Sequence, residues 1–210
     1  NMVITGGLQI YSTYNANVQN ALDKTYADSS NFLKIGKGDV QPESAICVMD
    51  YSGHIVGMVG GRGEKTDNRG LNRATQTKRP PGSSIKPLSV YSPSLENNTV
   101  TYSSFVRDAP LTLADGSKYP KNSYSGSNMC VYKALERSVN TVAVRLVNNL
   151  TTQKSFDFIT KRYHISTLVE SETRDDGSVM SDVTLSAMAM GGTTYGVKVS
   201  EMCAAYACFG

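Results

Sequence analysis

A chain of 210 residues with 40% hydrophobic content is long enough to bury an ordinary core. Its 21 basic and 18 acidic residues are spread along the sequence, so the formal net charge is only +3 and no basic stripe is present. Nucleic acid is therefore not expected as a partner. No segment reaches the roughly 20 consecutive apolar residues of a membrane helix, and the sequence does not open with a signal pattern.

The four cysteines form no Cys-x-x-Cys pair, and the two histidines lie far from them in the sequence. A zinc site is therefore not expected, and we assign no metal or cofactor. Cys203 and Cys208 are five residues apart in an expected helix, so they should point to different faces. We interpret the cysteines as buried thiols, which leaves the redox compartment open.

The N-terminal third predicts a strand, a helix and a hairpin. Residues Gly7 to Thr13 alternate in strand fashion, and Asn15 or Asn17 can cap a helix after them. The apolar face of that helix comprises Val18, Ala21, Leu22 and Tyr26. The runs Ser44 to Asp50 and His54 to Val59 predict an antiparallel hairpin in a buried sheet.

Two glycine-containing segments in this third predict loops. Lys34 to Gly38 lacks the upstream glycine and the following Ser or Thr of a phosphate-binding loop, so we expect no nucleotide site there. Gly60 to Gly82 is rich in Gly, Arg, Asn, Thr and Pro and predicts an irregular connection.

The remaining sequence predicts helices separated by one long loop. A helix should begin near Ser83, and the polar stretch from Glu96 to Met129 predicts a functional loop. Apolar residues then recur every three or four positions, which predicts one or two short helices over residues 130 to 149. Two further helices are expected, Lys154 to Tyr163 and Ser200 to Phe209, the second capped by Ser200. We find no internal repeat and no domain boundary.

Ser83 and Lys86 form a Ser-x-x-Lys pair directly after Pro-Pro-Gly, at the expected start of a helix. Backbone N–H groups at a helix start favour a developing negative charge on the serine oxygen. A serine hydroxyl needs a base within reach, and a neutral lysine one turn later can serve. On the pair alone we favour the plainer interpretation, a helix-capping serine and a solvated lysine.

A second element, Ser138-Val139-Asn140, lies some fifty residues later at an expected break between helices. Its plain interpretation is a capping serine and an exposed asparagine, since Ser29-Ser30-Asn31 gives the same spacing by accident. In a functional interpretation, Ser138 relays a proton between Lys86 and a leaving amine, and Asn140 holds Lys86 and a substrate amide.

Four stretches, taken together, resemble the transpeptidase domain of bifunctional (class A) penicillin-binding proteins. The segment around the serine is the most specific, and the similarity spans nearly the whole chain. In order, the stretches are Gly7 to Thr13, Asn72 to Pro87, Ala134 to Leu146, and Gly191 to Ala207.

The resemblance implies an α+β fold, an antiparallel sheet flanked by helices as in penicillin-binding proteins and serine β-lactamases, with the nucleophile at a helix N-terminus against the sheet edge. It implies that Ser83 attacks the penultimate D-alanyl carbonyl of a peptidoglycan stem peptide. An amine of a neighbouring stem peptide then resolves the ester, and β-lactams acylate the same serine. Lys86, Ser138 and Asn140 would complete the catalytic set, and Ser84 with Asn140 would bind substrate.

The sequence departs from the family pattern in two respects. The third motif, Lys-Thr-Gly, is absent, so we expect residues 1 to 210 to be a transpeptidase domain without its C-terminal strands and with weak or no acylation alone. No glycosyltransferase domain precedes it, so no glycan polymerisation is expected. Location on the outer side of the bacterial membrane is implied, with any tether lying outside this chain.

Two alternatives stay open. A serine β-lactamase-like hydrolase would share Ser83, Lys86 and Ser138, but the sequence has no recognisable counterpart of the glutamate that hydrolyses the ester in class A β-lactamases. A non-catalytic penicillin-binding-like domain would retain the pocket without the chemistry, and the missing third motif is its only support.

Overall fold

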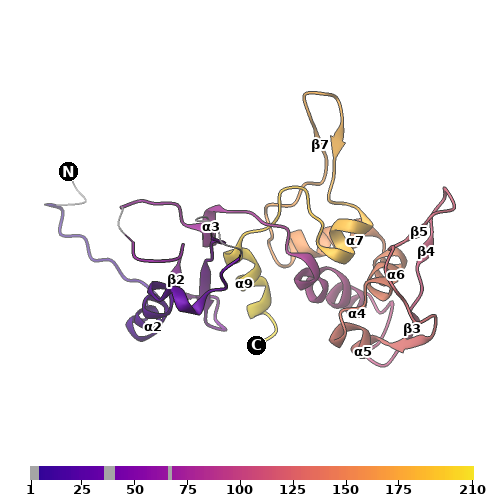
Figure 1. Cartoon of the computed structure of the whole chain (residues 1–210), viewed down its shortest axis with the longest axis horizontal. Helices are drawn as coiled ribbons and strands as arrows, with labels where there is room; N and C mark the ends of the chain where they lie inside the picture. Colours follow the sequence, from indigo (N-terminus) through magenta and orange to yellow (C-terminus); the bar gives the residue numbers. More distant parts are fainter. Residues whose placement is uncertain (1–4, 36–40, 66–67) are drawn as a thin grey trace. The chain divides into compact units, whose positions relative to one another are not determined.

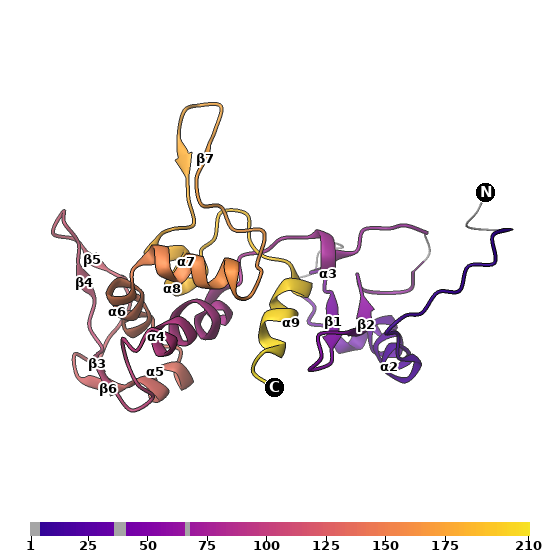
Figure 2. The ribbon, with the colours of Figure 1, turned by 180° about the vertical axis from the view of Figure 1, so that it is seen from behind.

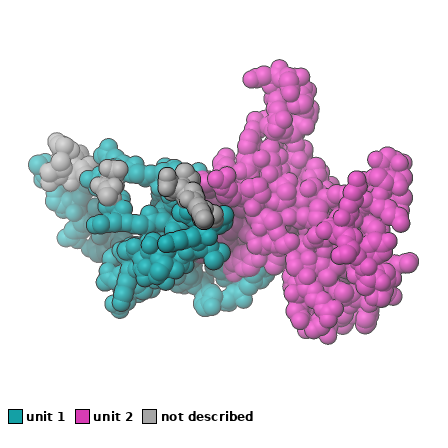
Figure 3. Space-filling view, in the orientation of Figure 1, with its two compact units in different colours: residues 1–76, 207–210 teal, residues 77–206 magenta. Residues whose placement is uncertain are grey.

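The structure is a computed structural model that describes residues 5–35, 41–65 and 68–210. The chain forms two compact units, which Figure 3 colours teal and magenta. Unit 1 comprises residues 1–76 and 207–210, and unit 2 comprises residues 77–206. The sequence analysis did not identify this boundary.

Unit 1 is built on the predicted hairpin, which is confirmed. Strands β1 (Ile46–Met49) and β2 (Ile55–Val59) pair antiparallel. The Asp50 carboxylate accepts two hydrogen bonds from backbone N–H groups of the connecting turn. Gly53 completes the turn with a φ of +85°, a conformation that costs glycine little. The strands are only partly buried, whereas a buried sheet was expected.

Helix α2 (Ala16–Ala27) packs against β2, as Figure 1 shows. Asn15 caps it, since its side chain accepts two hydrogen bonds from the backbone of the first turn, as predicted. The Gln19 amide bonds both the N–H and the C=O of Met58, so it continues the hydrogen bonding of β2. Close packing requires Gly57, where an added Cβ would lie 2.9 Å from Val18.

Two other expectations for unit 1 meet different outcomes. The predicted strand over Gly7 to Thr13 is wrong: the segment is exposed coil, because alternation alone provides no partner strand. The predicted loop over Lys34 to Gly38 lies partly outside the described residues. The short helices here are η1 (Ser29–Asn31) and α3 (Arg73–Gln76), and the latter interrupts an otherwise irregular connection.

Unit 2 has a helical core, and Figure 2 shows it from behind. Helix α6 (Asn140–Leu150) is buried nearly all round and packs on α8 (Leu185–Met190). Helices α5 (Val131–Glu136) and α6 confirm the short helices predicted over residues 130 to 149. Helix α7 (Thr152–Lys161) confirms the helix predicted over Lys154 to Tyr163. Helix α8 was missed, because its Leu-Ser-Ala-Met-Ala-Met sequence shows no clear apolar period.

The predicted helix near Ser83 exists but changes type along its length. It begins as a 3-10 helix, η2 (Gly82–Ile85), and continues as a π-helix, η3 (Pro87–Tyr91). Only its last turns, α4 (Ser92–Glu96), are α-helical. A mid-helix π-turn of this kind is frequent at functional sites.

Short strands occupy parts of the predicted long loop. Sequence alternation is too brief over two or three residues to predict them. Strand β3 (Phe105–Arg107) pairs with β6 (Asn128–Cys130), and β4 (Leu111–Thr112) pairs with β5 (Lys118–Tyr119). A further hairpin, β7 (Glu172–Thr173) with β8 (Val179–Met180), extends away from α7 in Figures 1 and 2.

The last helix, α9 (Val199–Ala207), matches the predicted helix over residues 200 to 209, but Ser200 lies inside its first turn and does not cap it. Of the cysteine thiols only Cys47 is buried, and Cys208 is exposed, so the expectation of buried thiols is wrong for the latter. No helix among the described residues is long and apolar enough to cross a membrane.

Candidate active site

Ser83 and Lys86 lie one 3-10 turn apart. The Lys86 backbone N–H donates to the Ser83 carbonyl, which closes the turn. Side chains three residues apart in a 3-10 helix lie on the same face. The two differ in environment, because Ser83 is exposed and Lys86 is only 1% exposed. The pair therefore combines an accessible hydroxyl with a buried amine.

The Lys86 amine brings the two sequence motifs together. Its Nζ donates to the Ser138 carbonyl at 2.6 Å and contacts the Ser138 hydroxyl at 3.1 Å. It also donates to Asn140 Oδ1 at 2.6 Å. No hydrogen bond between the Ser83 and Lys86 side chains occurs among the described residues. Catalytic hydrogen bonds are often long without substrate and tighten when it binds.

Burial changes the acid–base behaviour of this amine. Removal from water lowers the pKa of Lys86 from 10.5 to about 8. The change disfavours the charged amine by about 3 kcal/mol. At pH 7 about 9% of the Lys86 side chains are therefore unprotonated and able to accept a proton.

Ser138 is held in an unusual backbone conformation between α5 and α6. Its φ is +53°, in the left-handed region that residues with a Cβ adopt at a cost. The Ser138 N–H donates to Leu135, and the next N–H, of Val139, donates to Ala134, so the turn is fixed by the end of α5. This turn directs both oxygens of Ser138 to Lys86.

Two glycines of the stretch Gly191 to Val197 allow the chain to approach the segment before Ser83. An added Cβ on Gly191 would lie 2.2 Å from the carbonyl oxygen of Gly82, and one on Gly196 would lie 2.3 Å from the backbone of Arg79. Arg79 and Val197 also exchange two backbone hydrogen bonds, of 3.0 and 2.9 Å. The backbone of residues 191 to 197 therefore packs directly against the backbone of the segment that precedes Ser83.

Ser84, the expected substrate contact, makes hydrogen bonds within the chain through both its hydroxyl and its carbonyl. Its hydroxyl donates to the Pro81 carbonyl at 2.7 Å, and its own carbonyl accepts a 2.6 Å hydrogen bond from Tyr206. These bonds brace the turn that carries Ser83.

Three residues that the sequence analysis did not single out extend the site. The Asn140 Nδ2 group donates to Asn122 at 3.3 Å. Thr141, the next residue of α6, donates its hydroxyl to the buried Asp108 carboxylate. The sequence around these residues does not predict these contacts, because Asn122 and Asn140 are 18 residues apart and Asp108 and Thr141 are 33 residues apart.

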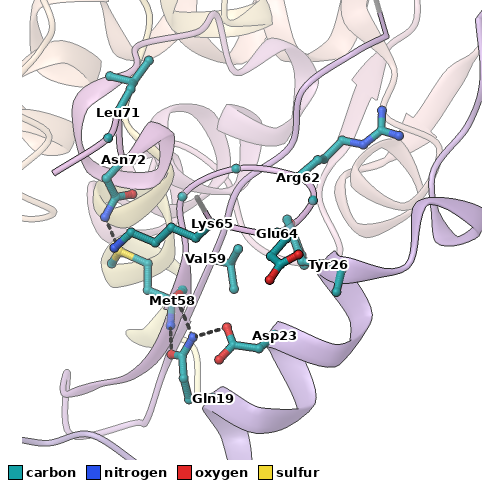
Figure 4. Close-up of a pocket in the computed structure, with 15 residues that line it drawn as sticks. Gln19, Asp23, Tyr26, Met58, Val59, Arg62, Glu64, Lys65, Leu71 and Asn72 are labelled. Atoms are coloured by element: carbon teal, nitrogen blue, oxygen red, sulfur yellow. Dashed lines mark hydrogen bonds between the residues drawn. The ribbon is translucent and has the colours of Figure 1, made fainter. Parts of the chain in front are cut away.

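A separate cavity of about 570 Å³ lies within unit 1, between α2, the end of β2 and the segment that follows it (Figure 4). None of the expected catalytic residues lines it. Figure 4 shows Gln19 bonded to Met58 and Asp23, so the polar groups on this wall already have partners.

Comparison with known proteins decides the family. The family described as penicillin binding protein transpeptidase domain matches residues 44–209. This chain belongs to that transpeptidase family. The predicted resemblance and the mixed helix and sheet fold of penicillin-binding proteins are therefore confirmed.

The transpeptidase chain has relatives among curated penicillin-binding proteins. It is 32% identical to penicillin-binding protein 1A of Clostridium tetani over 99% of this chain and 27% of that protein. It is 33% identical to penicillin-binding protein 4 of Bacillus subtilis over 97% of this chain and 30% of that protein. The chain thus spans about a quarter to a third of these relatives.

Solved structures agree on the fold of this transpeptidase chain. Penicillin-binding protein PonA1 from Mycobacterium tuberculosis superposes with a TM-score of 0.70 at 22% identity, over 98% of this chain and 50% of that one. Penicillin-binding protein 1A from Haemophilus influenzae gives 0.61 at 26% identity, over 80% of this chain and 23% of that one.

Proposed function

We propose that the chain carries the serine nucleophile of a D,D-transpeptidase that cross-links peptidoglycan stem peptides and is acylated by β-lactams. The observation that carries the proposal is the buried Lys86 amine, which contacts Ser138 and Asn140 and has a pKa of about 8. A surface lysine with a capping serine would have neither the burial nor these partners.

In the first step the neutral Lys86 amine takes the proton of the Ser83 hydroxyl as its oxygen attacks the penultimate D-alanyl carbonyl carbon. The tetrahedral intermediate collapses with cleavage of the C–N bond. The leaving D-alanine amine receives the proton from Lys86 through the Ser138 hydroxyl. The Ser138 Oγ atom lies 3.1 Å from the Lys86 Nζ atom. An ester on Ser83 remains.

In the second step an amine of a neighbouring stem peptide attacks the ester carbonyl. Its excess proton returns by the same route, and the Ser83 oxygen leaves as a hydroxyl. The new amide bond is the cross-link. A β-lactam follows the first step only, because its opened ring stays attached and its ester hydrolyses slowly.

Binding roles and location complete the proposal. Asn140 holds a substrate amide and Ser84 contributes to substrate binding. The binding partners are the D-alanyl-D-alanine stem peptide, the acceptor amine and β-lactams. The domain works on the cell-wall side of the bacterial membrane, to which it is anchored through a segment outside this chain. No metal or organic cofactor takes part in this chemistry.

Treatment of the natural protein that contains this chain with a fluorescent penicillin tests the proposal. We expect one label on Ser83, none in Ser83→Ala and almost none in Lys86→Ala, with the adduct located by mass spectrometry. Ser103→Ala is the control, because Ser103 is an exposed serine outside the proposed site, and its replacement should leave the adduct at position 83.

The label distinguishes the alternatives by its lifetime. Persistence for many minutes is expected of a transpeptidase, whereas loss within seconds would indicate a β-lactamase-like hydrolase. A protein that is folded and takes up no label at all would be a non-catalytic binding domain. Label that persists in Ser83→Ala would refute the assignment of the nucleophile.

A further inference from the structure

Asn140 has two chemically different ends on one flat amide, and the site uses both. Its Oδ1 accepts the 2.6 Å hydrogen bond from Lys86, and its Nδ2 donates to Asn122 Oδ1 at 3.3 Å. The two ends of an amide have nearly the same shape, so hydrogen-bond partners determine which end faces which neighbour. If the amide rotated by half a turn, an N–H group would face the Lys86 amine, and Lys86 would lose this acceptor.

Asn122 Oδ1 is the acceptor opposite Nδ2, and it stabilises the observed orientation of Asn140. A rotated Asn140 amide could keep this hydrogen bond only if the Asn122 amide rotated as well, so the two amides and Lys86 favour the observed arrangement together. Ser138 does not discriminate in this way, because its two contacts are made with Lys86.

Asn122 itself lies on an exposed segment that Asp108 links to α6. The Asp108 carboxylate, 5% exposed, accepts the Thr141 hydroxyl with one oxygen and the Ser125 N–H, at 2.8 Å, with the other. Thr141 is the neighbour of Asn140, and Ser125 lies three residues after Asn122. One carboxylate therefore ties the segment that bears Asn122 to the helix turn that bears Asn140.

The backbone around this carboxylate adds two further ties. The Asp108 N–H donates to the Ser127 carbonyl at 2.8 Å, and the Asp108 carbonyl accepts from Gly126 at 2.9 Å. Burial opposes ionisation of the Asp108 carboxyl, yet the hydrogen bonds from Thr141 and Ser125 hold its pKa below its usual value. The tie is thus a charged acceptor at neutral pH, and charged hydrogen bonds are the stronger kind.

We propose that Asn122 is a positioning residue for the transpeptidase reaction: its hydrogen bond to Nδ2 stabilises the Asn140 amide in the orientation in which the oxygen, and not the nitrogen, faces Lys86. The inference rests on the proposed function of Lys86 as the base. Asn122 acts through Asn140 and touches neither the nucleophile nor Lys86.

The test compares three variants of the natural protein that contains this chain. Asn122→Leu keeps the approximate size and removes the acceptor, and Asn122→Asp keeps an acceptor oxygen. Ser123→Leu is the matched control, since Ser123 is an exposed neighbour on the same segment and has no hydrogen bond that the structure describes. Stopped-flow acylation by a fluorescent penicillin separates the dissociation constant of the initial complex from the acylation rate constant.

We expect Asn122→Leu to acylate about tenfold more slowly with an unchanged dissociation constant of the initial complex. At pH 9, where Lys86 is mostly unprotonated, Asn122→Asp should recover most of the rate, because it keeps the acceptor oxygen and its added charge matters least there. Ser123→Leu should match the wild type. Because Asn122 is exposed, all three should keep the wild-type midpoint of thermal unfolding, which a circular dichroism scan measures.

Two results would overturn the inference in distinguishable ways. If wild-type protein is labelled on Ser83 and Asn122→Leu reacts at the wild-type rate, Asn122 has no positioning role while the proposed function stands. If Asn122→Asp is as slow as Asn122→Leu, an acceptor is not what matters. If the wild type carries no adduct on Ser83, the proposed function fails and the inference fails with it.

Discussion

The pH dependence of acylation follows from the environment of Lys86. Its pKa is about 8, and only the unprotonated amine can accept the Ser83 proton. The unprotonated fraction is about 1% at pH 6, about 9% at pH 7, about half at pH 8 and about 90% at pH 9. The second-order rate constant of acylation should therefore rise about ninefold from pH 6 to 7, about fivefold from 7 to 8 and less than twofold from 8 to 9.

The pH at which this profile levels off depends on the sign of the pKa change. A lysine in water would still gain about tenfold in its unprotonated fraction with each pH step up to about 10, so its profile would not level off by pH 9. A lower pKa moves the plateau to lower pH. The profile thus separates the buried Lys86 from an ordinary lysine without any substitution.

The assay is fluorescent-penicillin labelling of the natural protein over short times from pH 6 to 9.5, corrected for hydrolysis of the free drug. Lys161→Met, which alters an exposed lysine paired with Asp157, should leave the profile unchanged. A rate that climbs tenfold per pH unit through pH 9, or one that does not change between pH 6 and 8, would refute Lys86 as a base with a lowered pKa.

Two predictions concern stability, and urea unfolding measures both. Asp182 is 1% exposed and accepts from the Val169 N–H and from the N–H and hydroxyl of Thr194, so Asp182→Ala removes the acceptor of three part-buried donors and should cost about 3–5 kcal/mol. A cost under about 1 kcal/mol, the size expected of an exposed carboxylate, would contradict this account. Tyr91→Phe should instead stabilise by about 1 kcal/mol, since the buried Tyr91 hydroxyl makes no hydrogen bond within the described chain and burial raises its pKa. Destabilisation of that variant would mean that the hydroxyl has a partner.

Sequence patterns predicted what depends on local periodicity and on linear motifs. The hairpin around Asp50 was predictable because two apolar runs flank a short turn that contains a glycine, Gly53. The helices over residues 130 to 163 were predictable because their apolar residues repeat at helical spacing. The pairing of Lys86 with Ser138 and Asn140 was anticipated from motif order, although spacing alone does not give the distances.

Features that depend on contacts between distant segments could not be predicted. In the sequence, Asp108 is not distinguishable from other loop aspartates, because its hydrogen bond with Thr141 depends on how α6 packs. Asn122 lies in a polar stretch with no periodicity, so its contact with Asn140 leaves no trace in the sequence. The strand expected over Gly7 to Thr13 failed for the converse reason, since alternation was present but no partner strand was there to use it.

The π-turn of η3 makes the molecule sensitive to changes in chain length. The Ser92 N–H bonds back five residues to the Pro87 carbonyl, so this turn holds one residue more than an α-helical turn. Five residues of a π-turn and four of an α-helical turn complete nearly the same rotation, so deleting one residue here would leave the helix on either side facing almost the same way. The deletion would instead remove one side chain from the buried packing around the turn, where Leu88, Ser89 and Val90 are fully buried. The tip of the β7–β8 hairpin is exposed, so natural homologues should vary in length there while keeping the count between Ser83 and Glu96 constant.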